Sequence, residues 1–158
     1  MSPNNHETAS ETPPVEAGTV LVTEKGEGLA QILADGRHRF LADEPLDHGG
    51  QDEGPSPYEL LLMSLGACTS MTLRLYATRK GWPLERIRIR LKHKKISDGN
   101  GNEPGEKPVL IDHIERHIEL SGPLDDAQRK RLLEIAGNCP VHRTLSSAIR
   151  IDTSASIA

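Results

Sequence analysis

Residues 56–81 read SPYELLLMSLGACTSMTLRLYATRKG and contain an extended apolar run. Ser56 precedes a proline, and Glu59 follows three residues later, which is the spacing of a capping box at the start of a helix. Gly81 is a typical C-terminal stop. Because apolar residues lie on nearly every side between positions 60 and 77, we predict one long helix buried at the centre of the fold.

A membrane span is the rival interpretation of this segment. It fails because a spanning helix needs about 18 or more consecutive apolar residues. Polar or small residues interrupt the run before that length, at Gly66, Thr69, Ser70, Thr72 and Arg74. We therefore expect a protein with no membrane partner.

Short β-like segments flank the predicted helix. Residues 19–24, 29–34 and 37–42 precede it, with Asp35 and Gly36 forming a strong hairpin signal between the second and third. Residues 43–56 read as a loop. After the helix, residues 87–92 and 114–120 alternate between apolar and polar side chains, as strands do.

The C-terminal part of the chain predicts a second helix, which Asp125 begins and Gly137 ends. A short third helix is expected over residues 141–147, after Pro140, and a last strand over 148–153. The main order is therefore β-β-β-α-β-β-α-β, an α+β fold.

Composition limits the class of protein. A chain of 158 residues with 35% hydrophobic residues is long enough for one domain with its own core, which we place at residues 19–158. Residues 1–18 read as a disordered tail without the features of an export signal, so we expect a cytoplasmic protein. Residues 97–108 read as a mobile loop.

The formal charge of −4 argues against nucleic acid as a partner. One basic row, at alternating positions from 86 to 94, is interpreted as a solvated sheet face that Glu115 and Glu119 offset. An anion-binding surface is the alternative interpretation of that row.

The two cysteines carry the chemistry that the sequence suggests. In a reducing compartment such a pair is more often redox-active than structural. Cys68 lies on an apolar helix face, where burial keeps a thiol inert, so a core role stays open for it. Cys139 precedes a predicted helix start, and the helix dipole with His142 would lower its pKa. Sequence alone does not show whether the two sulfurs meet.

A metal site is the other use of Cys68, Cys139 and His142. A closed zinc site needs four ligands, and the sequence has no C-x-x-C pair. We therefore predict neither a metal nor a cofactor.

Three segments resemble the OsmC/Ohr superfamily of osmotically inducible and organic hydroperoxide resistance proteins. They are GPSPYELLL at 54–62, LGACT at 65–69 and NCPVH at 138–142. The resemblance covers residues 19–153 and points to the OsmC-like branch. It implies an intertwined homodimer with two long central helices enclosed by sheets, and with active sites at the subunit interface.

The resemblance also implies a mechanism. Cys68 would attack an organic hydroperoxide and become a sulfenic acid, and Cys139 would condense with it to a disulfide. A dithiol reductant would restore both thiols. Because Leu and Met residues surround Cys68 on the predicted helix, a hydrophobic hydroperoxide is the expected substrate.

The sequence departs from the hydroperoxide reductases at two positions. Their glutamate directly follows the proline, whereas here Tyr58 does, and Glu59 lies about 180° from Cys68 around a straight helix. Glu59 is therefore better explained as the acceptor of the capping box. In the first hairpin the reductases carry an arginine, whereas here Lys25 supplies charge without the planar fork. Glu59, Lys25 and His142 are the supporting residues that the sequence offers.

The sequence thus leaves two functions open. The first is a thiol peroxidase of the OsmC type. The second is a stress-associated dimer whose cysteines are core residues and whose subunit interface binds an apolar ligand. Accessible, reactive thiols would favour the first function.

Overall fold

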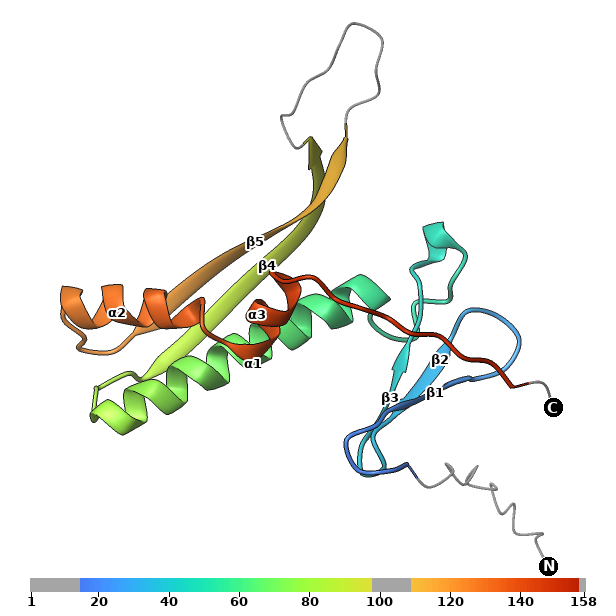
Figure 1. Cartoon of the computed structure of the whole chain (residues 1–158), viewed down its shortest axis with the longest axis horizontal. Coiled ribbons are helices and arrows are strands. Elements are labelled where there is room, and N and C mark those ends of the chain that lie inside the picture. The colour runs from blue at the N-terminus through green and yellow to red at the C-terminus, as the bar shows by residue number, and fades with distance from the viewer. Residues whose placement is uncertain (1–14, 98–108, 157–158) are drawn as a thin grey trace, which may run out of the picture. The chain divides into compact units, whose positions relative to one another are not determined.

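The computed structural model describes residues 15–97 and 109–156 (Figure 1). Most of the predicted tail (1–18) and nearly all of the predicted loop (97–108) lie outside the described residues. The chain divides into two compact units, residues 1–59 and 60–158, and each is described here by itself. A single domain over residues 19–158 stays a prediction.

The first unit holds a three-stranded antiparallel sheet in the order β1 (Leu21–Glu24), β2 (Gln31–Ala34) and β3 (Arg39–Ala42). The three strands were predicted, each about two residues longer at its N-terminal end. Asp35 fixes the turn between β2 and β3, because its carboxylate accepts the amide N–H groups of Arg37 (2.9 Å) and His38 (2.7 Å). Gly36 adopts φ +86° there, which confirms the hairpin signal.

The loop after β3 is organised around Asp43, whose side chain is buried. Its carboxylate accepts the amide N–H groups of Gln51 (2.8 Å), Glu44 (2.8 Å) and Glu53 (3.3 Å). The hydrogen bond from Gln51 is the largest influence that lowers the pKa of Asp43. A 3₁₀ turn, η1 (Leu46–His48), lies within this loop.

The long helix α1 (Pro57–Lys80) has the bounds that the sequence predicts. Glu59 accepts hydrogen bonds from the Ser56 amide (2.8 Å) and hydroxyl (2.9 Å), and its own amide reaches the Ser56 hydroxyl at 3.4 Å. The capping box is therefore confirmed. The helix ends before Gly81, which adopts φ +63°.

Burial of α1 on nearly every side was predicted, and this is wrong for the single chain. Its buried residues form one stripe with a spacing of four, namely Leu65, Thr69, Leu73 and Ala77. Other apolar side chains of α1 are exposed, including Met63, Met71 and Leu75. The reason is that helices and strands of the same chain cover only one side of α1.

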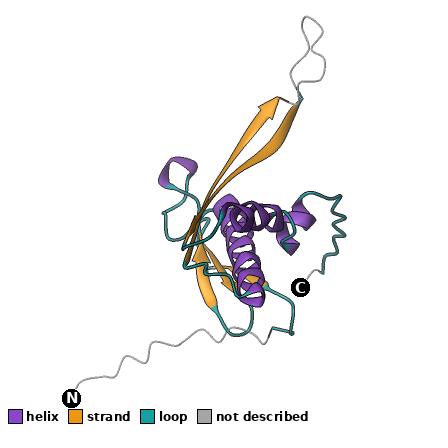
Figure 2. Cartoon of the chain, turned by 90° about the vertical axis from the view of Figure 1, so that its left-hand side faces the viewer, coloured by secondary structure: helices purple, strands orange, loops and turns teal. Residues whose placement is uncertain are grey.

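Two long antiparallel strands, β4 (Arg86–Ser97) and β5 (Leu110–Ser121), form a hairpin (Figure 2). Both are longer than predicted. α1 approaches the hairpin closely at Gly66, where an added Cβ would lie 2.9 Å from the Leu91 side chain. The outer face carries the predicted charge pairs, since Glu119 binds Arg88 at 3.2 Å and Arg90 at 2.6 Å.

The core of the second unit lies where α1, the hairpin and α2 (Asp126–Ala136) meet. Its fully buried members include Leu73 and Leu132, with Tyr76 and Trp82 packed at the edge. Asp125 and Gln128 form the predicted capping box of α2. The short helix α3 (Pro140–Leu145) follows and lies beside the middle of α1 (Figure 1).

The strand predicted over residues 148–153 does not form, so the observed order ends with α3 and a segment without regular secondary structure. Ile149 (56% exposed) and Ile151 (83% exposed) carry the alternation that suggested a strand. Alternation predicts an extended backbone, but a strand also needs a partner edge, and no other described strand pairs with this segment.

By length and composition, α1 is the one helix among the described residues that could cross a membrane. A core helix of a soluble protein meets the same criteria. Here Leu73 and Ala77 of α1 belong to the packed core, as expected for a core helix.

Candidate functional site: a pair of thiols

The middle of α1 carries Cys68 and Thr69 on adjacent parts of its surface. Neighbouring residues of a helix point about 100° apart, so the two side chains cannot face the same direction. Thr69 belongs to the buried stripe and is fully buried. Cys68 is half-buried and lies at the border between this stripe and the exposed side of α1.

Cys139 is the N-cap residue of α3 and is completely buried. Pro140 occupies the first turn, as the sequence predicts for a helix start. The cap is formed by sulfur, because the backbone N–H of His142 donates to Cys139 Sγ at 3.3 Å. The end of α2 and the start of α3 therefore fix the position of this sulfur.

Thr69 joins the two elements. Its Oγ1 lies 3.4 Å from Cys139 Sγ, across seventy residues of sequence. The same hydroxyl can donate to the Leu65 carbonyl at 2.8 Å, and it accepts a hydrogen bond from Arg116 Nη1 at 2.9 Å. An arginine of β5 thus contacts the oxygen that touches the buried sulfur.

These contacts change the acidity of Cys139. Burial raises the pKa of its thiol and is the largest single influence. Hydrogen bonds with the Thr69 hydroxyl and the His142 amide oppose burial, followed by the Cys68 side chain and the charge of Arg116. Their sum lowers the pKa of Cys139 below its ordinary value of 9.0. Both cysteines are free thiols.

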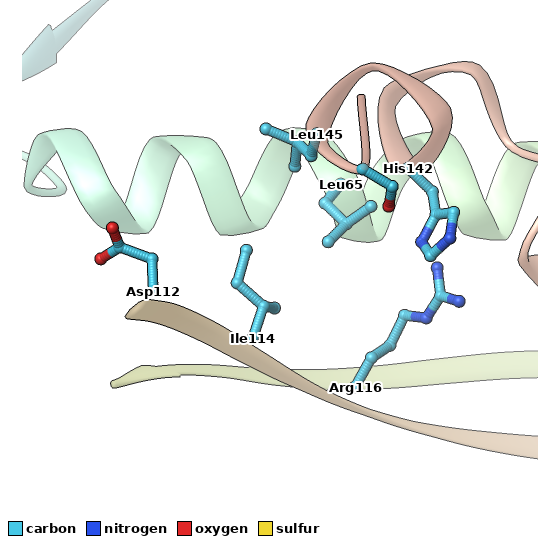
Figure 3. A pocket seen from close by; sticks show the side chains of 7 residues that line it. Leu65, Asp112, Ile114, Arg116, His142 and Leu145 are labelled. Atoms are coloured by element: carbon cyan, nitrogen blue, oxygen red, sulfur yellow. The ribbon is translucent and has the colours of Figure 1, made fainter. Parts of the chain in front are cut away.

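A cavity of about 420 Å³ opens beside this cluster. Figure 3 shows the Arg116 guanidinium and the His142 ring facing each other at one side of it. The cavity also has three apolar lining side chains, and Asp112 lies on β5 farther along. The lining residues are Leu65, Asp112, Ile114, Arg116, His142, Leu145 and Ser146.

The sequence profile of the family described as OsmC-like protein matches residues 50–154. This chain belongs to the OsmC-like family. The match includes both cysteines, Thr69, Arg116 and His142, so the whole cluster lies within the family domain. A search of curated proteins finds no match.

Solved structures of the same fold agree with the family. A protein described as an osmotic stress induced and detoxification response protein, from Psychrobacter arcticus, has 23% identity and a TM-score of 0.63 over 82% of this chain and 88% of its own. An OsmC-like protein from Mycoplasma pneumoniae has 21% identity and a TM-score of 0.60 over 81% and 84%. The organic hydroperoxide resistance protein OsmC from Legionella pneumophila has 18% identity and a TM-score of 0.57 over 80% and 88%.

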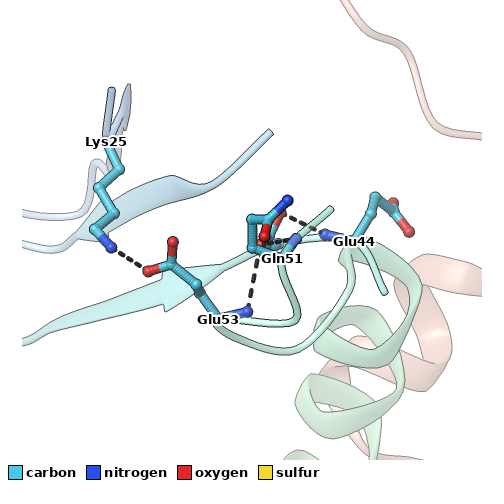
Figure 4. Close-up of polar contacts among 5 residues, drawn as sticks. Lys25, Glu44, Gln51 and Glu53 are labelled. Carbon is cyan, nitrogen blue, oxygen red and sulfur yellow. Dashed lines mark hydrogen bonds and ion pairs between the residues drawn. The ribbon is translucent and has the colours of Figure 1, made fainter. Parts of the chain in front are cut away.

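The supporting residues predicted for this OsmC-like protein lie in different surroundings. Lys25 forms an ion pair with Glu53 (Figure 4), and Glu59 is used by the capping box. Both belong to the first unit, whereas both cysteines belong to the second. His142 reaches Cys139 through its backbone amide, and its ring lines the cavity.

Sequence reasoning missed Thr69 and Arg116. Arg116 had a visible signal, because the alternation of the second hairpin strand places it between Ile114 and Ile118 on the apolar face. A lone arginine on such a face needs a polar partner. Thr69 had no comparable signal, since a threonine inside an apolar helix is commonly satisfied by the carbonyl four residues earlier.

Among the described residues, no group of three His, Cys, Asp or Glu side chains is arranged to hold a metal ion.

Proposed function

We propose that this protein is a cysteine-based reductase of organic hydroperoxides, in which Cys68 reacts with the peroxide and Cys139 resolves the product. The observation that supports this most strongly is the polar contact between Thr69, the neighbour of Cys68, and the buried sulfur of Cys139. The lowered pKa of Cys139, to which the Cys68 side chain contributes, also supports a working pair.

In the first step the Cys68 thiolate would attack the O–O bond of a hydroperoxide. The sulfur takes one oxygen as a sulfenic acid, and the alkoxide leaves and picks up a proton to become an alcohol. In the second step the Cys139 thiolate attacks the Cys68 sulfur and expels hydroxide, forming a disulfide. A dithiol reductant then reduces the disulfide to two thiols and is itself oxidised.

The burial of the thiols fits this division of roles. Cys68 is half-buried and is the one that an external peroxide can approach. Cys139 is completely buried, and its only required reaction partner is the neighbouring Cys68. Three side chains that line the cavity beside them, Leu65, Ile114 and Leu145, are apolar and would contact the organic part of a hydroperoxide.

We propose further that the active form is a homodimer in the cytoplasm, where reducing conditions would sustain the cycle. Beside the buried stripe, α1 carries residues at alternating spacings of three and four, the pattern of a helix-to-helix seam. Among them, Met71 is 65% and Leu75 58% exposed. The seam comprises Leu61, Ser64, Cys68, Met71 and Leu75, so a second copy packed along it would place Cys68 at the subunit interface.

The decisive experiment follows the consumption of cumene hydroperoxide with dithiothreitol as reductant. We expect wild type to consume the peroxide and Cys68→Ser to lose the activity. Ser70→Ala serves as the control, because it changes a nearby α1 residue and leaves both thiols. If wild type and Cys68→Ser consumed peroxide at the same rate, the proposal would be wrong.

The dimer has its own test. Met71→Glu places a charge in the exposed seam of α1, so we expect a homodimer to dissociate to monomers. Light scattering after size-exclusion chromatography measures the mass directly. A wild type that is monomeric at all concentrations would contradict the dimer.

The exposed apolar seam also favours a second candidate, a dimer that binds an apolar ligand without catalysis. It predicts that native Cys68 reacts slowly with alkylating reagents. It also predicts that native mass spectrometry finds a retained apolar molecule. Fast alkylation together with peroxide turnover would exclude this candidate.

A further inference from the structure

Arg116 occupies an unusual position for a charged residue. It lies on the face of β5 that also carries Ile114 and Ile118, and its side chain is half-buried. Its hydrogen bond goes to the Thr69 hydroxyl, and no carboxylate in residues 15–97 or 109–156 forms an ion pair with it. A cation withdrawn from water is costly unless an anion lies near it. Its charge does act on the Cys139 thiol, whose pKa it helps to lower.

The proton of the Thr69 hydroxyl has two alternative acceptors. Arg116 donates to the oxygen, so that oxygen keeps one proton to give and one lone pair to offer. When Cys139 is a thiol, the Thr69 proton can go to the Leu65 carbonyl at 2.8 Å and the S–H can point at the oxygen. When Cys139 is a thiolate, the same proton can turn to the sulfur at 3.4 Å.

This exchange favours the anion for an electrostatic reason. Donation from a guanidinium polarises the hydroxyl and makes its proton a stronger donor. The Leu65 carbonyl remains part of helix α1 when the Thr69 proton turns away from it. Besides Arg116 and the Thr69 hydroxyl, the groups that act on Cys139 are the Cys68 thiol from α1 and the His142 amide from α3.

We propose that Arg116 and Thr69 are positioning residues for the resolving thiol, and that Arg116 supplies the cation of the thiol pair. Arg116 acts through the Thr69 hydroxyl to hold Cys139 as a thiolate, ready to attack the sulfenic acid of Cys68. This inference rests on the proposed function. The supporting positive charge then comes from Arg116 on β5 of the second unit, whereas the sequence suggested Lys25 as its source.

The first test needs no peroxide. In the Cys68→Ala background, Cys139 is the only thiol, and the ultraviolet absorbance of its thiolate can be followed against pH. We expect Thr69→Val and Arg116→Met to raise the pKa of Cys139. The conservative variants Thr69→Ser and Arg116→Lys should keep part of the lowering that the wild-type residues cause. Arg90→Met is the matched control, because Arg90 lies on the outer face of the hairpin and pairs with Glu119.

The second test measures how fast the disulfide closes after cumene hydroperoxide is added to protein with both cysteines. Each unit of increase in the pKa of Cys139 lowers the fraction present as thiolate about tenfold, while the remaining thiolate becomes about threefold more nucleophilic. The net slowing is therefore about three- to fourfold per unit, and the sulfenic acid should persist long enough for dimedone to trap it.

The outcomes separate the two proposals. If Thr69→Val, which nearly preserves side-chain volume, leaves the Cys139 titration unchanged, Arg116 and Thr69 do not hold the thiolate and this inference is overturned. If the titration shifts but wild type consumes no hydroperoxide, the reductase proposal fails while the assignment of the cation stands. Circular dichroism identifies any variant that has unfolded, and the Thr69→Ser and Arg116→Lys titrations then decide the matter.

Discussion

Two buried acceptors, one in each unit, are surrounded in different ways. Asp43 accepts three N–H groups, all from the backbone of its own loop and within ten residues. Cys139 receives its polar contacts from three elements, through the Thr69 hydroxyl of α1, the His142 amide of α3 and the charge of Arg116 on β5. Both groups have a lowered pKa.

Under the proposed function, the difference separates a structural anion from a reactive one. A carboxylate with an ordinary pKa of 3.8, lowered further, is ionised at neutral pH. Its hydrogen bonds hold the loop in place. A thiol with an ordinary pKa of 9.0 that is lowered by its contacts forms a thiolate at a lower pH than a free cysteine, and the thiolate is the nucleophilic form.

The largest effect is expected when the reactive acceptor is removed. Cys139→Ser keeps an acceptor for the His142 amide, so α3 should remain folded, but the hydroxyl cannot resolve a sulfenic acid. After cumene hydroperoxide is added, we expect dimedone to label Cys68 fully and no intramolecular disulfide to form. Mass spectrometry of the labelled protein measures both, and a disulfide-dependent mobility change in this variant would contradict the assignment.

A core residue of the second unit serves to test whether a loss of stability alone affects the reactions of the thiols. Leu132 is completely buried in the core, so Leu132→Ala should lower the free energy of unfolding by about 2–5 kcal/mol. Urea unfolding measures this change. Below the unfolding transition, the rate at which the disulfide closes should match that of wild type.

The structural acceptor should behave in the opposite way to Cys139. Asp43→Asn removes the charge that the three amides bind, so we expect a lower unfolding temperature and an unchanged rate of thiol oxidation. Calorimetry and peroxide consumption on the same preparation test both parts. A variant that loses oxidation while it keeps its unfolding temperature would remove the distinction between the two acceptors.

The pH dependence of stability gives the smallest and most specific effect. Because folding lowers the pKa of Asp43, its contribution is complete above the ordinary pKa of 3.8 and is lost as the pH falls through the folded value. The contribution of Cys139 appears at higher pH, since the unfolded thiol holds its proton up to about 9.0. Relative to Cys139→Ser, wild type should therefore gain stability as the pH rises toward 9.0, as urea unfolding at several pH values would show.

Local patterns predicted the helices and most strands correctly because caps, turns and alternation are written in neighbouring residues. Ser56 with Glu59 and Asp125 with Gln128 form the contacts that their spacing suggests, and Gly36 after Asp35 adopts the positive φ of the predicted turn. The strand over 148–153 was predicted wrongly because pairing depends on a distant edge. The burial of α1 was overestimated because composition does not tell which chain covers each face.

The candidate site was predictable in part. Both cysteines and His142 were identified from their sequence context, but the contact between Thr69 and Cys139 joins residues seventy positions apart. No local pattern encodes such a contact. Arg116 could have been found from the apolar face of its strand, whereas its target depends on how α1 packs against the hairpin.

The central claim is that Cys68 and Cys139 form one redox couple. Peptide mapping under non-reducing conditions, after a stoichiometric amount of cumene hydroperoxide, tests it most directly. We predict that the peptides carrying the two cysteines are joined within a single chain and separate again with dithiothreitol. Unlinked peptides, with Cys68 unmodified or oxidised beyond the sulfenic acid, would contradict the account.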